Sequence, residues 1–247
     1  MNKLSIILTT FNSITNLQRT LNSIEMQDYP DIEVNIKDGG SSDGTLDVIE
    51  NYAKTSKYTV NWITSPDQGI YDAMNQGYKL ASGDVIVFFN DAFVINNAVS
   101  RMMELIESSH GCVGAHADLV YADDTRIVRS WKMGPQKSLY CGWMPGHPTL
   151  FLKREIYEQY GLYKTDYRIS ADYEFMVRFL KDRKNRLAYL PETIIRMYYG
   201  GTSTSSAGSY VESLKEGHRA LRENGIHCAW IADGMRTLRV LLQFIRK

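Results

Sequence analysis

Four short polar segments each follow an apolar, strand-like run in the first part of the chain. They are residues 9–12, 38–45, 65–69 and 90–91. Their hydroxyl, amide and carboxylate side chains are groups that can bind a hydroxylated or phosphorylated ligand, or a divalent cation. Because ligands bind at the carboxyl ends of the strands in open α/β sheets, these segments predict one site at one sheet edge.

The segment at residues 38–45, Asp-Gly-Gly-Ser-Ser-Asp-Gly-Thr, has the composition of a tight turn. Gly39 and Gly40 permit positive φ angles, and Ser42 or Asp43 can cap a helix that follows. A strand-to-helix turn without a ligand explains these residues as well. The chain contains neither G-x-G-x-x-G nor G-x-x-x-x-G-K-[ST], so it predicts neither a Rossmann dinucleotide site nor a P-loop.

Alternating strands and helices in the first half would position these segments. Runs with the period or the β-branched content of strands are residues 4–9, 32–37, 58–63 and 85–89. Apolar residues recur every three or four positions in residues 14–25, 46–52 and 70–81. This order predicts an α/β fold over about residues 1–107, with a mostly parallel central sheet and helices on both faces.

The second half has a less regular pattern. We expect a hairpin around Asp123-Asp124, a strand at 149–152, a helix after Ala171, and two short strands within 186–199 that are separated at Pro191. Residues 200–208 are rich in glycine, serine and threonine, which predicts a loop, and helices follow to the C-terminus. Without internal repeats or a linker, the chain is expected to form a single domain.

The composition excludes several classes of protein. The 247 residues carry 28 Lys+Arg and 28 Asp+Glu, and this zero formal net charge argues against a nucleic-acid binder. Cys112, Cys141 and Cys228 are odd in number and widely spaced, which indicates neither a disulfide framework nor a metal-ligand pair and favours a reducing cytoplasm. The sequence lacks the pattern of a signal peptide and any apolar stretch of about 18 residues, so we expect neither secretion nor a membrane span.

Several of these segments together closely resemble the family 2 inverting glycosyltransferases. The matching stretches are LSIILTTFN at 4–12, DGGSSDGT at 38–45, DQGIYDAMN at 67–75, SGDVI at 82–86 and SADYEF at 170–175. The resemblance covers about residues 3–205 and is greatest to bacterial members that build exopolysaccharide and O-antigen repeat units. It implies a GT-A fold, with a nucleotide-sugar-binding half (about 1–107), an acceptor-binding half (about 108–205) and a C-terminal helical tail (about 206–247).

The resemblance also assigns a nucleotide-binding set at the strand ends. Thr9 and Phe11 would flank the base of the donor, with Asn12 beside them. Asp38 would accept a hydrogen bond from the base, and Asp67 would lie near the base or the ribose. The chemistry agrees, because a ring can stack on phenylalanine and a carboxylate can accept an N–H. The family usually has tyrosine at the position of Phe11.

A metal site is expected after the fourth strand, where the family carries aspartates that hold a divalent cation. Such a cation would bridge the diphosphate and neutralise the leaving group. Here Ala92 and Phe93 stand at the positions of the two family aspartates, and neither side chain can ligate a metal. We therefore expect Asp91, displaced by one residue, to be the metal-facing carboxylate for a weakly held Mg²⁺ or Mn²⁺.

By the same resemblance, Asp172 is the general base that deprotonates the acceptor hydroxyl. Inversion by single displacement needs such a carboxylate on the face opposite the leaving group. Without the resemblance, a carboxylate in the first turn of a helix has a structural explanation. Trp143 and His147 correspond to an acceptor-binding loop, although a purely structural histidine fits equally well. Residues 200–203 resemble a segment that closes over the diphosphate, and they also fit a plain loop.

The C-terminal segment at residues 230–247 joins apolar residues to the cations Arg236, Arg239, Arg246 and Lys247. Such a helix can lie on an anionic membrane, or it can pack in the core or between two subunits.

We expect a cytoplasmic enzyme, peripheral to the inner membrane if this helix binds lipid. It would transfer a sugar from a nucleotide-sugar, preferably a UDP-sugar, to a hydroxyl of a glycan precursor, and we expect this acceptor to be lipid-linked. A nucleotidyltransferase is an alternative, but residues 9–12 lack its basic glycine-rich loop. The other alternative is a degenerate nucleotide-sugar-binding partner subunit, which Ala92 and Phe93 favour.

Overall fold

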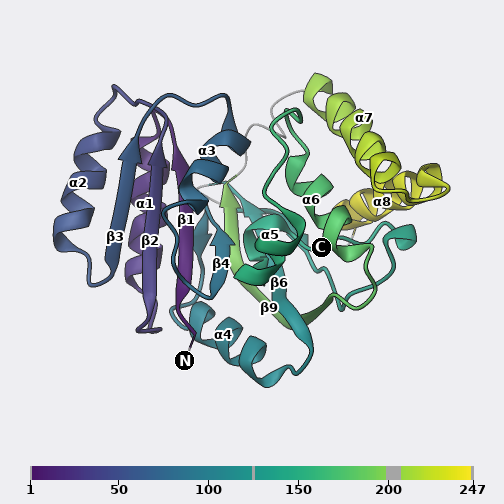
Figure 1. The fold of residues 1–247 in the computed structure, drawn as a ribbon, viewed down its shortest axis with the longest axis horizontal. Coiled ribbons are helices and arrows are strands. Elements are labelled where there is room, and N and C mark those ends of the chain that lie inside the picture. Colours follow the sequence, from purple (N-terminus) through teal and green to yellow (C-terminus); the bar gives the residue numbers. More distant parts are fainter. Residues whose placement is uncertain (1, 124–125, 199–206, 246–247) are drawn as a thin grey trace.

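The computed structural model describes residues 2–123, 126–198 and 207–245, and these residues form an α/β fold around one nine-stranded sheet (Figure 1). The strands are β1 (Leu4–Thr10), β2 (Ile32–Asp38), β3 (Thr59–Thr64), β4 (Val85–Phe88), β5 (Ala92–Phe93), β6 (Cys112–Ala122), β7 (Ile127–Trp131), β8 (Phe151–Lys153) and β9 (Arg186–Tyr198). The helices are α1 (Ile14–Glu25), α2 (Thr45–Thr55), α3 (Ile70–Tyr78), α4 (Ala98–Ser108), α5 (Arg154–Tyr160), α6 (Ala171–Leu180), α7 (Ala207–Glu223) and α8 (Ala229–Ile245). Short 3₁₀ turns lie at Leu139–Cys141 and His147–Thr149.

The first half is the parallel sheet that the sequence predicts. Strand β1 pairs in parallel with β2 and β4, and β2 pairs in parallel with β3. In this register Thr10 lies beside Asp38, and Asp38 lies beside Thr64, so the carboxyl ends of the three strands meet at one edge. The polar segments that follow these strands are thereby brought together.

Helices cover both faces of the sheet because successive strand residues point to opposite sides. Ile6 belongs to the apolar cluster that packs α1, α2 and α4 against one face. Its neighbour Ile7 belongs to the cluster formed with α3, α5 and α6 on the other face, to which α7 and α8 also contribute. The predicted α/β fold class is confirmed.

The second half extends the sheet with mixed pairing. Strand β8 pairs antiparallel with β4 and β6, β9 runs parallel to β6, and β5 pairs antiparallel with β9. The hairpin predicted around Asp123-Asp124 is confirmed by the antiparallel pairing of β6 with β7. The strand expected at 149–152 is β8, which begins two residues later, and the helix expected after Ala171 is α6.

The prediction of two strands separated at Pro191 is wrong, because β9 is continuous from Arg186 to Tyr198. The pairing with β6 moves from Ala117–Leu190 to Asp118–Thr193, so Pro191 and the residue after it bulge out of the register. A bulge leaves a residue unpaired, and proline lacks the N–H that pairing would require. The strand therefore accommodates the proline and continues.

The C-terminal part folds as two helices, as expected. Most of the predicted loop at 200–208 lies outside the described residues, and so do Arg246 and Lys247. Within α8, the Arg236 guanidinium lies over the Tyr173 ring, 4.4 Å from its centroid, and Arg239 donates to the Met133 carbonyl at 3.3 Å. None of the helices in the described part of the chain is long and apolar enough to cross a membrane.

Candidate active site

Main-chain hydrogen bonds join the loops at the carboxyl ends of the first strands. Gly39 N–H donates to the Thr10 carbonyl at 2.9 Å, and Ser65 N–H donates to the Asp38 carbonyl at 3.1 Å. Asn12 adopts a φ of 46°, in the left-handed region that asparagine tolerates. Its N–H donates to the Ser41 hydroxyl at 2.8 Å, which ties the loop after β1 to the loop after β2.

An exposed aromatic ring and a carboxylate meet at Gly39. The Phe11 side chain is 62% exposed, which is unusual for a large apolar group. A Cβ placed on Gly39 would lie 3.1 Å from Phe11 Cδ2 and 3.1 Å from Asp67 Oδ2, so both side chains pack closely against this glycine. Phe11 thus offers a platform on which a planar base can stack, with Asp67 beside it.

A buried lysine supports this arrangement and was not anticipated from the sequence. Lys37 is completely buried, and its Nζ donates to the carbonyls of Asp38 and Ser65, each at 2.7 Å. It also pairs with Asp67 Oδ2 at 3.1 Å, which compensates a charge that burial would otherwise penalise. In sequence, Lys37 occupies an alternating polar position of a strand, the usual pattern of a solvent-facing residue.

Asp38 lies within the turn that follows β2. This residue is completely buried, and its carboxylate accepts hydrogen bonds from Gly40 N–H, Ser41 N–H, the Ser41 hydroxyl and the Thr64 hydroxyl at 2.6–2.9 Å. Burial alone would raise the pKa of Asp38, but these hydrogen bonds outweigh it and hold the pKa below its usual value. Asp38 therefore organises the turn, and a hydrogen bond from its carboxylate to a base stays a prediction.

At the neighbouring strand ends, Thr9 and Asn90 bind each other. Thr9 N–H donates to Asn90 Oδ1 at 3.0 Å, and Asn90 Nδ2 donates to the Thr9 hydroxyl at 2.9 Å. The next residue, Asp91, is partly buried, and this burial raises its pKa to about 7 against the lowering effect of Tyr198 N–H. The Phe93 ring stacks on Phe89 in the core, with 4.2 Å between ring centroids, so this position is closed to any ligand.

These observations fit a divalent cation that is held by few protein ligands. Among the described residues, three or more His, Cys, Asp or Glu side chains do not gather anywhere into a group that could hold a metal. The raised pKa of Asp91 indicates a carboxylate that a cation would stabilise in its ionised form. Asp91 fits as a single protein ligand, and the other ligands would have to come from a diphosphate and from water.

Asp172 lies in the first turn of α6 and accepts a hydrogen bond from the Tyr71 hydroxyl at 3.0 Å. The Tyr71 hydroxyl also lies 2.5 Å from the Ile169 carbonyl oxygen, and burial together with Asp172 raises the pKa of Tyr71. Burial raises the pKa of Tyr121 as well, Arg129 opposes this rise, and the charges of Asp91 and Asp172 add smaller contributions to it.

The two acceptor-binding candidates differ in their placement. His147 Nε2 lies 2.7 Å from the Tyr163 hydroxyl, and burial lowers the pKa of His147 although Asp172 opposes the shift. Its ring is therefore neutral at pH 7. Trp143 is only 1% exposed, and its indole N–H donates to the Met133 carbonyl at 3.0 Å. The expectation that Trp143 stacks on a sugar is wrong, because its ring is enclosed in the core.

Polar residues of the segment at 67–75, most of which forms α3, make contacts that hold the site together. Asp72 Oδ2 accepts the N–H of Gln68 at 3.0 Å, which shapes the loop after β3. Tyr71 contacts Asp172, and Asn75 exchanges two hydrogen bonds with the main chain of Tyr163, at 2.8 and 3.1 Å. One helix therefore binds both the loop beside Phe11 and the elements that carry the candidate base.

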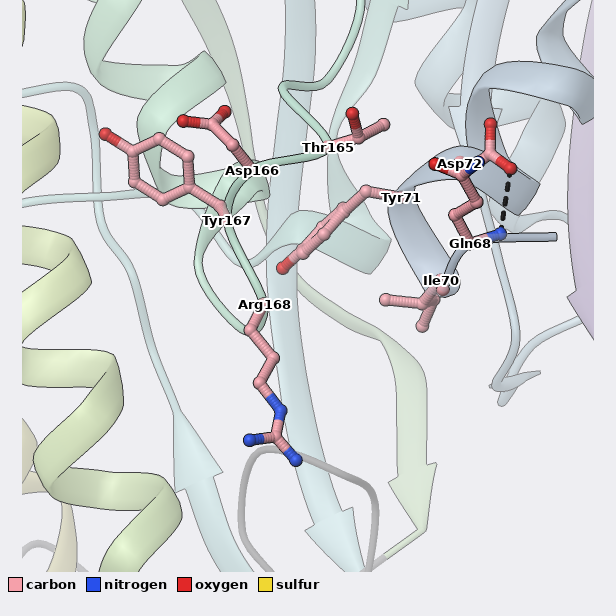
Figure 2. Close-up of a pocket in the computed structure, with 9 residues that line it drawn as sticks. Gln68, Ile70, Tyr71, Asp72, Thr165, Asp166, Tyr167 and Arg168 are labelled. Atoms are coloured by element: carbon pink, nitrogen blue, oxygen red, sulfur yellow. Dashed lines mark hydrogen bonds between the residues drawn. The ribbon is translucent and has the colours of Figure 1, made fainter.

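A pocket of about 210 Å³ lies where α3 faces the loop that precedes α6. Residues 68–72 form one wall and residues 165–168 form the other. Figure 2 shows the Tyr71 ring between Asp72 on the α3 side and Asp166 and Tyr167 on the loop. The pocket thus adjoins Asp172 through Tyr71, although sequence patterns gave no indication of it.

Comparison with known proteins gives relatives at moderate identity. The family model described as Glycosyl transferase family 2 matches residues 5–194. A PGL/p-HBAD biosynthesis glycosyltransferase of Mycobacterium bovis is 29% identical over 215 residues, which cover 81% of this chain and 79% of that protein. An uncharacterized glycosyltransferase of Mycobacterium tuberculosis is 33% identical over 181 residues, which cover 70% of this chain and 67% of that protein.

Solved structures share the fold at low identity. Staphylococcus aureus TarS 1–349, in complex with UDP-GlcNAc, has a TM-score of 0.69 at 19% identity, with 99% of this chain and 73% of that chain covered. The mannosyltransferase PcManGT from Pyrobaculum calidifontis, in complex with GDP-Man and Mn²⁺, has a TM-score of 0.67 at 15% identity, with 100% and 76% covered. This chain spans 43% of a longer TarS chain.

At these identities the solved structures establish the GT-A-like fold alone. The family model, by contrast, extends from β1 into β9. The matched range includes all the candidate-site residues at the strand ends and the candidate base on α6. This chain therefore belongs to glycosyl transferase family 2.

Proposed function

We propose that this chain transfers a sugar from a nucleotide-sugar donor, preferentially a UDP-sugar, to a hydroxyl of a bacterial glycan precursor, with inversion at the anomeric carbon. The supporting observation is that one sheet edge carries two groups of side chains, one suited to a nucleoside and one suited to an acceptor hydroxyl. The exposed Phe11 ring lies beside Asp67, while Asp172 is hydrogen-bonded to Tyr71 near the neutral His147. A nucleoside needs an aromatic platform, and attack by a hydroxyl needs a carboxylate base.

Solved relatives support this class of donor. TarS has been crystallised with UDP and with UDP-GlcNAc, which is why we favour a UDP-sugar. The mannosyltransferase PcManGT was crystallised with GDP-Man and Mn²⁺, which supports a cation held near Asp91. A lipid-linked acceptor would suit the exposed apolar side chains of α8, among them Trp230 and Leu238. The three cysteines are free, which supports a reducing, cytoplasmic setting.

In the reaction we propose, Asp172 accepts the proton of the acceptor hydroxyl while the hydroxyl oxygen attacks the anomeric carbon. The bond between that carbon and the nucleoside diphosphate breaks on the opposite face, so the configuration inverts. The Tyr71 hydroxyl, whose one proton is shared between the Ile169 carbonyl and Asp172 Oδ1, holds Asp172 in position. A divalent cation, when bound through Asp91, supplies charge neutralisation for the departing diphosphate.

Thermal stabilisation by nucleotides tests the donor assignment. UDP, GDP, dTDP and CMP are added separately, with and without Mn²⁺. We expect UDP to raise the melting temperature most, because a ligand that binds only the folded state stabilises it by about 2.7 kcal/mol at a hundred times its Kd. Phe11→Ala should abolish this effect, and Met26→Ala, at an exposed site after α1, should preserve it. A larger effect of GDP or dTDP would contradict the UDP assignment.

Turnover and product stereochemistry test the assignment of the base. Asp172→Asn should keep donor binding and reduce kcat by about 10²–10⁴, the usual contribution of a positioned base. Product analysis by NMR should show an inverted anomeric centre. A variant within tenfold of the wild type would remove Asp172 from the mechanism, and retention of configuration would exclude single displacement. Nucleotide binding without any turnover would favour the partner-subunit alternative.

A further inference from the structure

Two segments of the second half carry a local excess of positive charge, although the whole chain has a formal net charge of zero. Residues 132–137 and 181–186 together contain six lysine and arginine side chains and one acidic side chain, Asp182. All six cations are exposed, namely Lys132, Lys137, Lys181, Arg183, Lys184 and Arg186. The side chains of Lys137, Arg183 and Arg186 form no hydrogen bond or ion pair with any described residue, so their charges are available to a partner.

Hydrogen bonds hold the two basic segments side by side. Gln136 Nε2 donates to the Asn185 carbonyl at 3.1 Å, and Leu187 N–H donates to Gln136 Oε1 at 2.7 Å. The second segment also contacts the turn between α7 and α8, where Lys181 Nζ donates to Asn224 Oδ1 at 3.3 Å. The two segments therefore form one basic surface, which reaches the start of α8.

Helix α8 packs directly against the chain that continues the first basic segment. A Cβ placed on Gly142 would lie 2.2 Å from the main-chain nitrogen of Arg236, so the two backbones meet. Within the segment itself, the Met133 carbonyl accepts a hydrogen bond from Arg239 at 3.3 Å. Helix α8 thus borders the basic surface, and with α7 it lies at the end of the molecule opposite α2 (Figure 1).

The charged side chains of α8 that the structure describes turn toward the protein. The Arg236 guanidinium lies over the Tyr173 ring of α6, and Asp233 Oδ2 lies 2.7 Å from His218 Nδ1 of α7. Arg239 binds Met133, as described above. The large exposed side chains of α8 are all apolar, and they are Trp230, Ile231, Met235 and Leu238. The helix therefore presents an uncharged, apolar face beside a surface of available cations.

We propose that this end of the molecule binds the surface of an anionic lipid bilayer. The cations of the two basic segments contact lipid phosphate groups, and the apolar face of α8 lies in the headgroup region. Trp230 is 69% exposed, and an indole ring suits the boundary between acyl chains and headgroups. An acidic protein would match the cations, whereas a bilayer matches the cations and the apolar face together.

Titration with vesicles tests the part played by charge, with energy transfer from tryptophan to a dansyl-labelled lipid as the signal. The wild type should bind vesicles of phosphatidylcholine and phosphatidylglycerol at least about tenfold more tightly than vesicles of phosphatidylcholine alone. Arg183→Gln combined with Arg186→Gln should weaken binding to the mixed vesicles roughly 30-fold, because each basic residue near an anionic membrane contributes about 1 kcal/mol. Lys54→Gln combined with Lys79→Gln is the matched control, since both lysines are exposed in the first half, and it should retain the affinity of the wild type.

Quenching by lipids that are brominated in their acyl chains tests the part played by α8. Tryptophan emission should be quenched in the mixed vesicles, and Trp230→Phe should remove most of this quenching. Equal affinities for the two double variants, quenching that persists in Trp230→Phe, or a wild type that binds no vesicles would each overturn the proposal. Binding of soluble poly-glutamate as tight as that of the mixed vesicles, without quenching, would overturn it in favour of an acidic macromolecule.

Nucleotide binding separates this inference from the proposed function. UDP should stabilise the Arg183 and Arg186 double variant as much as the wild type, because the basic segments lie outside the strand ends that carry Phe11 and Asp67. This measurement also shows that the double variant is folded. If the wild type binds anionic vesicles and is not stabilised by any nucleotide, the proposed function fails and the membrane surface stands.

Discussion

The Tyr71 hydroxyl is a positioning group for the candidate base at the residue scale. It contacts Asp172 Oδ1 at 3.0 Å and so fixes the position of that carboxylate. Tyr71→Phe should lower kcat by about 10- to 100-fold and leave the Kd for UDP unchanged, because Asp172 then loses the group that orients it toward the acceptor. Tyr58→Phe is the matched control, since it also removes a buried hydroxyl bond, here to Gln27, far from the site. Equal kcat values for the two variants would leave Tyr71 with a structural role.

The raised pKa of Asp91 predicts that metal binding depends on pH. Burial raises its pKa from 3.8 to about 7, so a cation must displace a proton at pH 6 and need not do so at pH 8. Mn²⁺ affinity in the presence of UDP should therefore increase by about tenfold between pH 6 and pH 8, in line with one proton released. Calorimetry at both pH values checks this.

Two variants make the assignment of Asp91 specific. Asp91→Asn should remove the pH dependence and most of the Mn²⁺ binding, because an amide has no proton to release. Ala92→Asp should strengthen Mn²⁺-dependent donor binding, since residue 92 is partly exposed whereas Phe93 is in the core. A steep pH dependence that persists in Asp91→Asn would assign the titration to another group.

At the scale of elements, Glu216 on α7 should control the order of the loop that precedes α6. It accepts three main-chain N–H groups, and hydrogen bonds to charged groups are worth about 1.5–3 kcal/mol each. Glu216→Ala should accelerate hydrogen exchange at the amides of Arg168, Ile169 and Ser170 by at least tenfold. Glu212→Ala, one turn earlier on the same helix, should leave these amides protected. Unchanged exchange in Glu216→Ala would mean that the loop is ordered by other contacts.

The sequence predicts some elements well because their periods are unambiguous. The strands and helices of the first half alternate regularly, and the register then requires their polar ends to meet. The continuity of β9 could not be predicted from the sequence, because a proline such as Pro191 usually ends a strand. The bulge that accommodates it depends on the pairing of β9 with β6. The roles of Asp38 and Trp143 were also out of reach, since burial and hydrogen-bond saturation arise from tertiary contacts. Lys37 was missed for the same reason.

At the scale of the whole molecule, α8 presents an apolar surface whose role can be tested. Trp230, Ile231 and Leu238 are 69%, 38% and 47% exposed. If this surface binds a membrane, the protein should co-sediment with anionic liposomes, and Trp230→Ser combined with Leu238→Ser should release most of it. Met26→Ser, at an exposed apolar residue after α1, should not. If the wild type and the double variant sediment equally, or if the wild type does not sediment, α8 would be assigned to packing or to contacts between subunits.

The pairing of β5 with β9 has a consequence for the order in which the site is assembled. Ala92 pairs with Arg196, and Phe93 pairs with Ile195, so the strand that follows Asp91 is fixed by residues that a ribosome adds much later. Domains acquire such long-range pairs late, because loop closure must precede the contacts that reward it. A nascent chain can therefore complete its parallel sheet and still lack a settled position for Asp91. If Asp91 has the proposed role, the ability to hold a donor diphosphate would therefore arise only after Ile195 and Arg196 have been added.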